Sequence, residues 1–358
     1  SEIEDRMTEL KMAGSITNFT TTRKNLPAAL ELVFDAMHNS IMPQDEFDQF
    51  KKQMQVMIES MRDKPDALAQ NAITQHFNTY PKGDPRYEYS LDESLEQLNK
   101  LTVDQVRAFY KEFGGTSRGE ISIVGDFDPK TVEKIIRDDY AKYVSKAHYA
   151  PVVTEYRPVK ATRVVIDTPD KENAIIVARS VFPINDTAPD APALTVANWI
   201  LGGGTGLSNR LIERLRQKEG LSYGAGSHVR IPAKGDNGSF VFRAIVAPQN
   251  MLQAEASARD VIAKAIKDGF TDQEVEEAKK GLLQAKQVAR SQDDVVARSW
   301  NDKMENQRTW VFSKKQAEAI SKLTTADVNA ALRKYIKPDE ITFVLAGDQK
   351  KAAQKKQD

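Results

Sequence analysis

The chain has 358 residues, enough for two domains of ordinary size, each with its own buried core. Lysine plus arginine equals aspartate plus glutamate at 51 each, and the basic residues are scattered, so we expect no nucleic-acid partner. The sequence has no cysteine, which excludes disulfides and Cys-ligated zinc, and its longest strongly apolar run, residues 193–201, is shorter than the roughly 20 residues that span a bilayer.

The first 145 residues alternate helical stripes with a β-rich run. Leu26, Leu30, Val33, Phe34 and Met37 have the spacing of one face of a helix. A second, methionine-rich stripe indicates a helix whose apolar face fills a core, and it consists of Phe50, Met54, Met57, Ile58 and Met61. After a further helix near residue 101, residues 121–124 predict a β-strand.

Residues 146–160 read as a linker. They contain Pro151 and Pro158 and show little hydrophobic periodicity. We therefore predict a first domain over residues 1–145 and a second over residues 161–358.

The sequence predicts more strands in the second domain than in the first. We expect strands at residues 162–167 and 173–181, a helix at 189–201, a hairpin from 221–231 and 238–246, and a closing strand at 341–345.

An internal repeat relates the two domains. Leu101-Thr-Val-Asp-Gln-Val106 recurs as Leu323-Thr-Thr-Ala-Asp-Val328, and Gly125-Asp126 recurs as Gly347-Asp348, both at an offset of 222 residues. Residues 42–52 match residues 270–280 at an offset of 228, and the pairs Lys51-Lys52 and Lys279-Lys280 indicate solvated helix faces. The repeat predicts an α+β fold of two α/β sandwich units, each a mostly antiparallel sheet covered by helices on one face. The first unit is expected to be truncated at its N-terminus.

The segment that follows residue 201 is the most informative for function. A glycine loop, residues 202–206, precedes a short helix with Ser208 as the expected N-cap and Leu207, Leu211 and Leu215 on one stripe. The loop fits neither phosphate-binding glycine pattern, so a tight turn between helices is favoured over a phosphate cradle. The helix then presents Arg216 and, seven residues later, Tyr223. A guanidinium and a phenol can together grip a peptide carbonyl, while the alternative is a surface arginine and a solvated strand tyrosine.

This segment resembles the non-metal, C-terminal domain of the pitrilysin-type (M16, inverted-zincin) metallopeptidases. The matching residues are the glycines, Ser208-Asn-Arg-Leu211, Arg216 and Gly220-Leu-Ser-Tyr223. The resemblance implies that Arg216 and Tyr223, with Gly203 and Gly204, bind the substrate backbone and stabilise the tetrahedral intermediate from across a closed chamber.

Active members of that family hold zinc with two histidines of a His-x-x-Glu-His helix and a later glutamate. The four histidines here, His38, His76, His148 and His228, include no pair spaced three or four apart. Alignment places Asp48 where the distal glutamate ligand stands and Phe50 where a second acid usually follows. We therefore expect no catalytic residue and no metal ligand in this chain, and zinc only in a partner catalytic half.

The long bacterial members of the family fuse an active half to a half without the motif, and this chain resembles the second. The implied function is the non-catalytic C-terminal part of a zinc metalloendopeptidase, forming half of the substrate chamber and anchoring peptide. The implied partners are a peptide substrate and a catalytic M16 half, fused or separate, and the implied location is the periplasm. Two alternatives stay open: a scaffold protein of the same fold without proteolytic role, and an active peptidase whose metal motif lies upstream of residue 1.

Overall fold

The computed structural model describes residues 9–13, 16–204 and 209–354. Its contacts divide the chain into two compact units, neither contiguous in sequence. Unit 1 contains residues 1–53, 97–151 and 287–309, and unit 2 contains residues 54–96, 152–286 and 310–358. The domain boundaries expected from the repeat describe copies of a sequence rather than contacts, and they stay a prediction.

Unit 2 is built on a five-stranded sheet with strand order β3-β7-β4-β6-β5. Its strands are β3 (Arg163–Asp167), β4 (Ala174–Pro183), β5 (Ser222–Arg230), β6 (Asn237–Val246) and β7 (Thr342–Gly347). The β3–β7 pair is parallel and the other three pairs are antiparallel. The α+β fold and the mostly antiparallel sheet are thus confirmed, and the strands lie within about two residues of the expected ranges.

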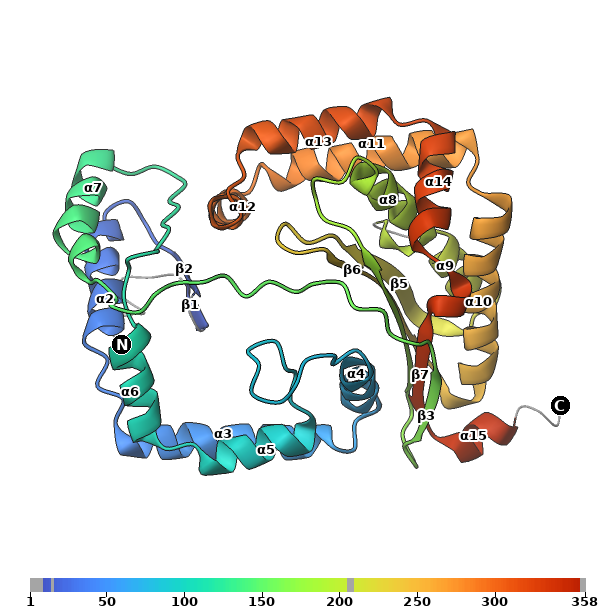
Figure 1. Cartoon of the computed structure of the whole chain (residues 1–358), viewed down its shortest axis with the longest axis horizontal. Helices are drawn as coiled ribbons and strands as arrows, with labels where there is room; N and C mark the ends of the chain where they lie inside the picture. The colour runs from blue at the N-terminus through green and yellow to red at the C-terminus, as the bar shows by residue number, and fades with distance from the viewer. Residues whose placement is uncertain (1–8, 14–15, 205–208, 355–358) are drawn as a thin grey trace. The chain divides into compact units, whose positions relative to one another are not determined.

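Helices of unit 2 cover one face of this sheet, as Figure 1 shows for α8, α10 and α14. The core beneath them includes Phe240, Phe242 and Phe343, none of which is more than 1% exposed. The helical segments that lie entirely in unit 2 are α4 (Pro65–His76), α8 (Ala191–Asn198), η2 (Trp199–Gly203), α9 (Arg210–Ile212), η3 (Glu213–Lys218), η4 (Pro248–Asn250), α10 (Met251–Asp268), α13 (Trp310–Lys322), α14 (Thr325–Tyr335), η5 (Pro338–Glu340) and α15 (Gln349–Gln354).

The opposite face of the sheet is also covered, which corrects the expectation of helices on one face. Ala69 and Ile73 of α4 pack against Ile175 and Val177 of β4. A strand buried on both faces is apolar at consecutive positions, and β4 opens with the run Ala-Ile-Ile-Val-Ala. That run was the available sign that a second layer covers the sheet.

The part of the expected linker that belongs to unit 2, from residue 152 on, is held in place by that unit. The backbone N–H of Glu155 donates to the Tyr80 hydroxyl at 3.2 Å, and that of Tyr156 donates to Asp236 Oδ1 at 2.7 Å. Arg157 lies over the Tyr80 ring at 4.2 Å. This extended segment therefore joins the loop after α4 to the turn between β5 and β6.

Unit 1 contains helices and a two-stranded sheet. Its core gathers Leu26 and Leu30 with Val132, Ile135 and Tyr140, which confirms the first helical stripe. The elements that lie entirely in unit 1 are β1 (Glu9–Ala13), β2 (Ile16–Thr20), α2 (Leu26–His38), α6 (Val103–Phe113), α7 (Pro129–Asp138), η1 (Tyr140–Lys142) and α12 (Asp293–Glu305). Three helices belong in part to each unit: α3 (Gln44–Met61), α5 (Leu91–Lys100) and α11 (Asp272–Ala289).

The repeat is visible in the helix boundaries. Helices α3 and α11 begin and end 228 residues apart, and α6 and α14 begin and end 222 residues apart. Both α6 and α14 start with a capping box, formed by Thr102 in one and Thr324 in the other.

A repeated hydrogen bond links these helix pairs. Lys51 Nζ donates to the Leu101 carbonyl at 2.8 Å, and its counterpart Lys279 donates to the Leu323 carbonyl at 2.9 Å. Lys279 is only 8% exposed. The expectation of solvated helix faces is therefore wrong for these two lysines, because Lys51 ties α3 to the residue before the capping box of α6, and Lys279 ties α11 to the residue before the capping box of α14.

Two other expectations in the first copy are wrong. Residues 121–124 are not a strand, since the counterparts of the strands that flank β7 are missing from the described part of unit 1. In the methionine-rich stripe of α3, Ile58 is buried but Phe50 and Met57 are 55% and 42% exposed. The stripe does not fill a core.

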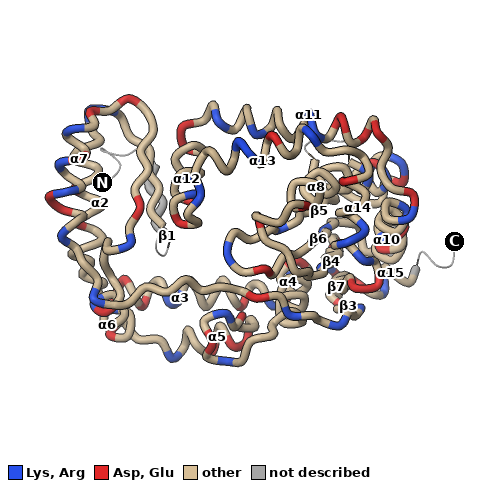
Figure 2. Tube along the Cα trace, turned by 45° about the horizontal axis from the view of Figure 1, so that its top comes forward, with Lys and Arg blue, Asp and Glu red and all other residues tan. Residues whose placement is uncertain are grey.

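Charge is distributed along the chain as the composition indicated. Figure 2 shows Lys and Arg interspersed with Asp and Glu rather than gathered in one segment. None of the helices in the described ranges has the length and apolarity needed to cross a membrane.

Candidate functional site

The glycine segment is the tightly packed end of a helix. Helix α8 continues into the π-helical turn η2, which ends at Gly203. A β-carbon on Gly202 would lie 2.5 Å from Ser227 Oγ and 2.7 Å from the Ser227 backbone nitrogen. A β-carbon on Gly203 would lie 2.3 Å from Asn198 Nδ2. Gly202 lets η2 approach β5 closely, and the rest of the expected loop, residues 205–206, lies outside the described residues.

A hydrogen-bonded pair holds this helix end to β5. The Ser227 hydroxyl donates to Asn198 Oδ1 at 2.8 Å, and Asn198 is 8% exposed. Gly203 and Gly204 were predicted to bind substrate. The structure supplies a packing role for Gly203 and for Gly204, whose β-carbon would lie 2.9 Å from the Trp199 carbonyl oxygen.

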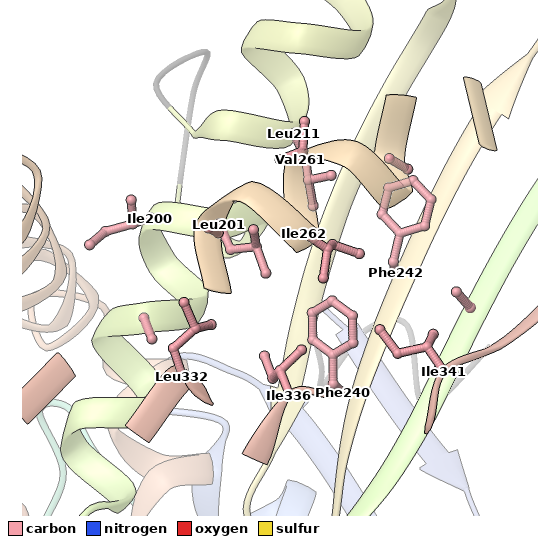
Figure 3. Packing of buried hydrophobic residues seen from close by; sticks show 14 of the residues in the cluster. Ile200, Leu201, Leu211, Phe240, Phe242, Val261, Ile262, Leu332, Ile336 and Ile341 are labelled. Atoms are coloured by element: carbon pink, nitrogen blue, oxygen red, sulfur yellow. The ribbon is translucent and has the colours of Figure 1, made fainter. Parts of the chain in front are cut away.

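The short helix after the glycines is fixed by a buried face and a cap. Asn209 is its N-cap, since Asn209 Oδ1 accepts a hydrogen bond from the Ile212 N–H at 2.9 Å. Ser208, the expected cap, lies outside the described residues, as does Leu207. Leu211 and Leu215, the other two members of the stripe, are fully buried, and Figure 3 shows Leu211 beside Val261 of α10.

Two arginines of this segment, Arg210 and Arg214, form ion pairs that hold it to neighbouring elements. Arg210 binds Glu274 through Nε at 2.7 Å and Nη2 at 2.8 Å, and it donates to the Gly269 carbonyl at 3.0 Å. Burial disfavours the charged form of Glu274, but the hydrogen bonds from Arg210 and Thr271 outweigh it and leave the pKa of Glu274 below its ordinary value. This pair anchors α9 to the start of α11.

Arg214 forms the second anchor. It pairs with Glu219, which also accepts a hydrogen bond from the Ser257 hydroxyl at 2.6 Å. Ser257 belongs to α10, so the end of η3 is fastened to that helix.

Arg216 differs from both of these arginines. It lies in η3, one position after the buried Leu215, and its side chain is exposed. Its guanidinium has no hydrogen-bond or ion-pair partner among the residues that the structure describes. The local fold thus fixes the backbone of Arg216 and leaves its cation available.

Tyr223 is displayed by a β-bulge. Gly220 has a φ of +60°, a conformation that favours glycine, and it turns the chain from η3 into β5. The register with β6 then shifts between Ser222, which pairs with Val246, and Gly224, which pairs with Ile245. A bulge redirects the side chain of its extra residue, and Tyr223 is 65% exposed.

The bulge is held by Ser222. Its hydroxyl accepts a hydrogen bond from the Gly224 N–H at 3.1 Å and lies 2.7 Å from the Gly224 carbonyl and 2.9 Å from the Ile245 carbonyl. β5 is the last strand in the order of this sheet. Arg216 and Tyr223, which the sequence analysis singled out, are both exposed, one before and one after the turn from η3 to β5.

The histidines do not gather. His76 lies 2.9 Å from the Lys160 carbonyl, His148 lies 2.9 Å from the Tyr149 carbonyl, and His228 is exposed on β5. Asp48 is exposed on α3 and accepts a hydrogen bond from Gln44 at 2.8 Å. Over residues 9–13, 16–204 and 209–354, no group of three His, Cys, Asp or Glu residues could hold a metal ion.

One charged residue that the sequence analysis did not single out is Arg179. It sits in the apolar strand β4, with its guanidinium 4.8 Å from the centre of the Phe77 ring. Burial, and then the neighbouring charge of Arg230, lower the pKa of Arg179. The available signal was a cation inside an otherwise apolar strand.

One family model and several known proteins match the chain. A family model described as the peptidase M16 inactive domain matches residues 100–282, just over half of the chain. An uncharacterized zinc protease of Mycobacterium tuberculosis is 24% identical over 261 residues, covering 72% of this chain and 57% of that protein. The non-peptidase homolog YmxG of Helicobacter pylori is 21% identical over 259 residues, covering 72% of this chain and 58% of that protein. The match to each of these relatives thus spans less than two thirds of its length.

Solved structures share the fold. The crystal structure of a peptidase M16 inactive domain from Pseudomonas fluorescens superposes with a TM-score of 0.78 at 21% identity, covering 95% of this chain and 80% of that one. The periplasmic protease PqqL of Escherichia coli gives a TM-score of 0.66 at 16% identity, covering 95% of this chain and 37% of that one.

Proposed function

Because the chain belongs to the peptidase M16 inactive-domain family, we propose that it anchors peptide substrate for a zinc metallopeptidase whose catalytic half lies outside residues 1–358. The observation that carries this proposal is the contrast within one turn. Arg210 and Arg214 are paired with carboxylates, whereas Arg216 and Tyr223 are exposed and take no such part in the fold.

The chemistry suits a peptide carbonyl. Arg216 offers guanidinium N–H donors and Tyr223 offers a phenolic donor, and a donor held ready for a developing oxyanion typically contributes about 3 kcal/mol to transition-state stabilisation. In this proposal the two residues form part of a chamber wall, and they orient the substrate backbone toward the partner half. No group of three possible metal ligands occurs among the described residues, and in this proposal zinc, the attacking water and the general base are supplied by that partner.

The periplasm is our proposed compartment, and it is supported by the fold shared with a periplasmic protease and by the implied kinship with exported bacterial enzymes. Fractionation of source cells with an antibody against this chain tests it, and recovery in the cytoplasmic fraction would contradict it.

A second candidate function is a scaffold without proteolytic role. It is favoured by the similarity to YmxG, which is described as a non-peptidase homolog. In a scaffold, the exposure of Arg216 and Tyr223 would have no functional consequence.

The test uses the chain together with its catalytic M16 half, fused or separate, and a fluorogenic peptide. Arg216→Ala and Tyr223→Phe should each lower kcat/KM, the first by about 100-fold, because each removes a donor to the reacting carbonyl. Lys218→Ala is the matched control, since Lys218 is an exposed cation of the same turn that pairs with Glu213 at 2.8 Å. The chain alone should hydrolyse no peptide and retain no stoichiometric zinc.

Three outcomes separate the candidates. Unchanged kcat/KM in both variants would contradict anchoring and favour the scaffold. One tightly held zinc per chain would contradict the non-catalytic assignment. Sequencing the gene upstream of Ser1 shows whether a His-x-x-Glu-His motif precedes this segment in the same polypeptide, which decides the third alternative.

A further inference from the structure

Helix α6 in unit 1 carries an aromatic face that the described residues leave uncovered. Phe109, Tyr110 and Phe113 are 61%, 37% and 48% exposed. The Phe109 and Phe113 rings are in contact, with centroids 4.8 Å apart and their planes tilted by 38°. Three neighbouring exposed aromatic side chains on one helix are typical of an interaction surface rather than of a solvated helix.

The internal repeat shows what covers the same positions in unit 2. At the offset of 222, the counterparts of Phe109, Tyr110 and Phe113 on α14 are Ala331, Leu332 and Tyr335. These are 2%, 0% and 5% exposed.

The layer that buries α14 comes from α8 and the sheet. The Tyr335 ring lies 5.3 Å from the Phe182 ring of β4, and its hydroxyl donates to Asp190, just before α8, at 2.8 Å. Figure 3 shows Leu332 pointing into the same cluster as Leu201 and Phe240. An α8-like helix and its strand are therefore what this face of the helix packs against in the second copy.

A second, independent observation in unit 1 concerns residues 121–124, with the sequence Ile-Ser-Ile-Val. Their counterparts, residues 343–346, form most of β7, which pairs with β3 on one side and β4 on the other. Residues 121–124 have the β-branched composition of a strand and are not assigned to one.

The hydrophobic neighbours of this segment nevertheless correspond to those of β7. Ile123 packs in one cluster with Leu30 of α2, and its counterpart Leu345 shares a cluster with Ala258 of α10, the residue that corresponds to Leu30 at the offset of 228. The segment thus shares a hydrophobic cluster with α2 as β7 shares one with α10, and strand partners for it are absent from the described residues of unit 1.

We propose that the aromatic face of α6 and residues 121–124 together form a docking surface for a strand-and-helix segment of an M16-type unit, equivalent to residues 163–198 of this chain. Strands of that segment would flank residues 121–124, and its helix would cover Phe109, Tyr110 and Phe113. The solvent-facing residues Asp104, Arg107, Lys111 and Glu112 mix both charges, which does not suit an anionic membrane surface. A second α6 from another copy would leave residues 121–124 without strand partners.

A photo-crosslinking experiment tests the proposal. The full polypeptide is produced in its source cells with p-benzoylphenylalanine in place of Phe109, and crosslinked peptides are identified by mass spectrometry. We expect the crosslinked peptide to come from an M16-type segment that aligns with residues 163–198. Its source, the same polypeptide or another chain, is read from the same spectrum. The control carries the crosslinker in place of Val56, which is 64% exposed on α3 and should give no such product.

The remaining outcomes contradict the proposal. These are crosslinks to α6 of a second copy, crosslinks to lipid, and no crosslink at all. In a second arm, Phe109→Asp combined with Phe113→Asp should abolish the product and speed hydrogen exchange at residues 121–124 by at least tenfold. Circular dichroism should stay unchanged because both side chains are exposed, which separates lost docking from lost folding. Arg216→Ala should leave the crosslink intact, so docking and substrate anchoring can fail independently.

Discussion

Units 1 and 2 contain corresponding helices but different sheets. Helices α6 and α14 begin and end at corresponding residues and both start with a capping box. In both, the carbonyl of the leucine just before the capping box accepts a hydrogen bond from a lysine of an earlier helix. Yet α14 contributes four buried residues to a core over five strands, whereas α6, Val103–Phe113, has one buried residue, Val103. Helix boundaries follow from local sequence, whereas burial depends on segments elsewhere in the chain or in a partner.

The largest effect on the free energy of unfolding is expected at Tyr335, whose counterpart in the repeat is Phe113. Tyr335→Ala removes a buried ring and its hydrogen bond to Asp190, and we expect it to lower the free energy of unfolding by about 3 to 5 kcal/mol. In residues 1–358 alone, without the docked segment proposed above, Phe113→Ala at the same position of α6 should cost less than about 1 kcal/mol because that ring is 48% exposed. Urea denaturation followed by circular dichroism measures both.

Equal losses in the two variants would show that α6 is buried as deeply as α14 in solution. The control is Phe109→Ala, whose ring is 61% exposed and which should behave like Phe113→Ala.

The same contrast explains how much of the fold could be read from the sequence. The helix that begins at Leu26 and the helix that follows Leu101-Thr102 were predicted correctly, because the signals for both lie among residues close together in the sequence. Residues 121–124 have strand-like composition, but a strand needs partners, and composition does not show whether partners are present. Lys279 was misread for a related reason, since its acceptor lies 44 residues away in sequence.

The candidate site shows the same division. Arg216 and Tyr223 were singled out by a motif, and their exposure is compatible with it. The reason that Tyr223 is exposed could not be predicted from the sequence, because the bulge depends on the register between β5 and β6. The anchoring of Arg210 on Glu274, 64 residues away, was likewise unpredictable from spacing.

A smaller effect on the free energy of unfolding is expected within unit 2, where Gly202 and Gly224 can be compared. Gly202→Ala would place its β-carbon 2.5 Å from Ser227 Oγ and 2.6 Å from a methyl of Leu211, so η2 must move away from β5. We expect a loss of about 1 to 3 kcal/mol in the free energy of unfolding. Gly224→Ala meets nothing within 4 Å and should change it by less than about 0.5 kcal/mol. If both variants proved neutral, η2 and β5 would not be in close contact.

The smallest expected effect is confined to unit 1. Tyr140 is buried, its hydroxyl donates to the Leu30 carbonyl at 2.8 Å, and burial raises its pKa to about 12. The folded protein therefore keeps the phenol proton at a pH where the unfolded chain, with a pKa of 10.0, has released it. The stability that this shifted pKa gives the folded protein is fully present below pH 10 and is lost as the pH rises toward 12. We expect the free energy of unfolding to fall by about 1 kcal/mol by pH 11.

Urea denaturation at pH 8, 9, 10 and 11 measures this loss, and Tyr140→Phe is the matched control because it keeps the ring and removes the titrating group. The variant should be about 1 kcal/mol less stable than the parent at pH 8, where it lacks the hydrogen bond to Leu30. The difference should shrink as the pH approaches 11, because only the parent still has a proton to lose. A constant difference from pH 8 to 11 would mean that Tyr140 is solvated, and the core that joins α2 to α7 would then be looser than the described contacts indicate.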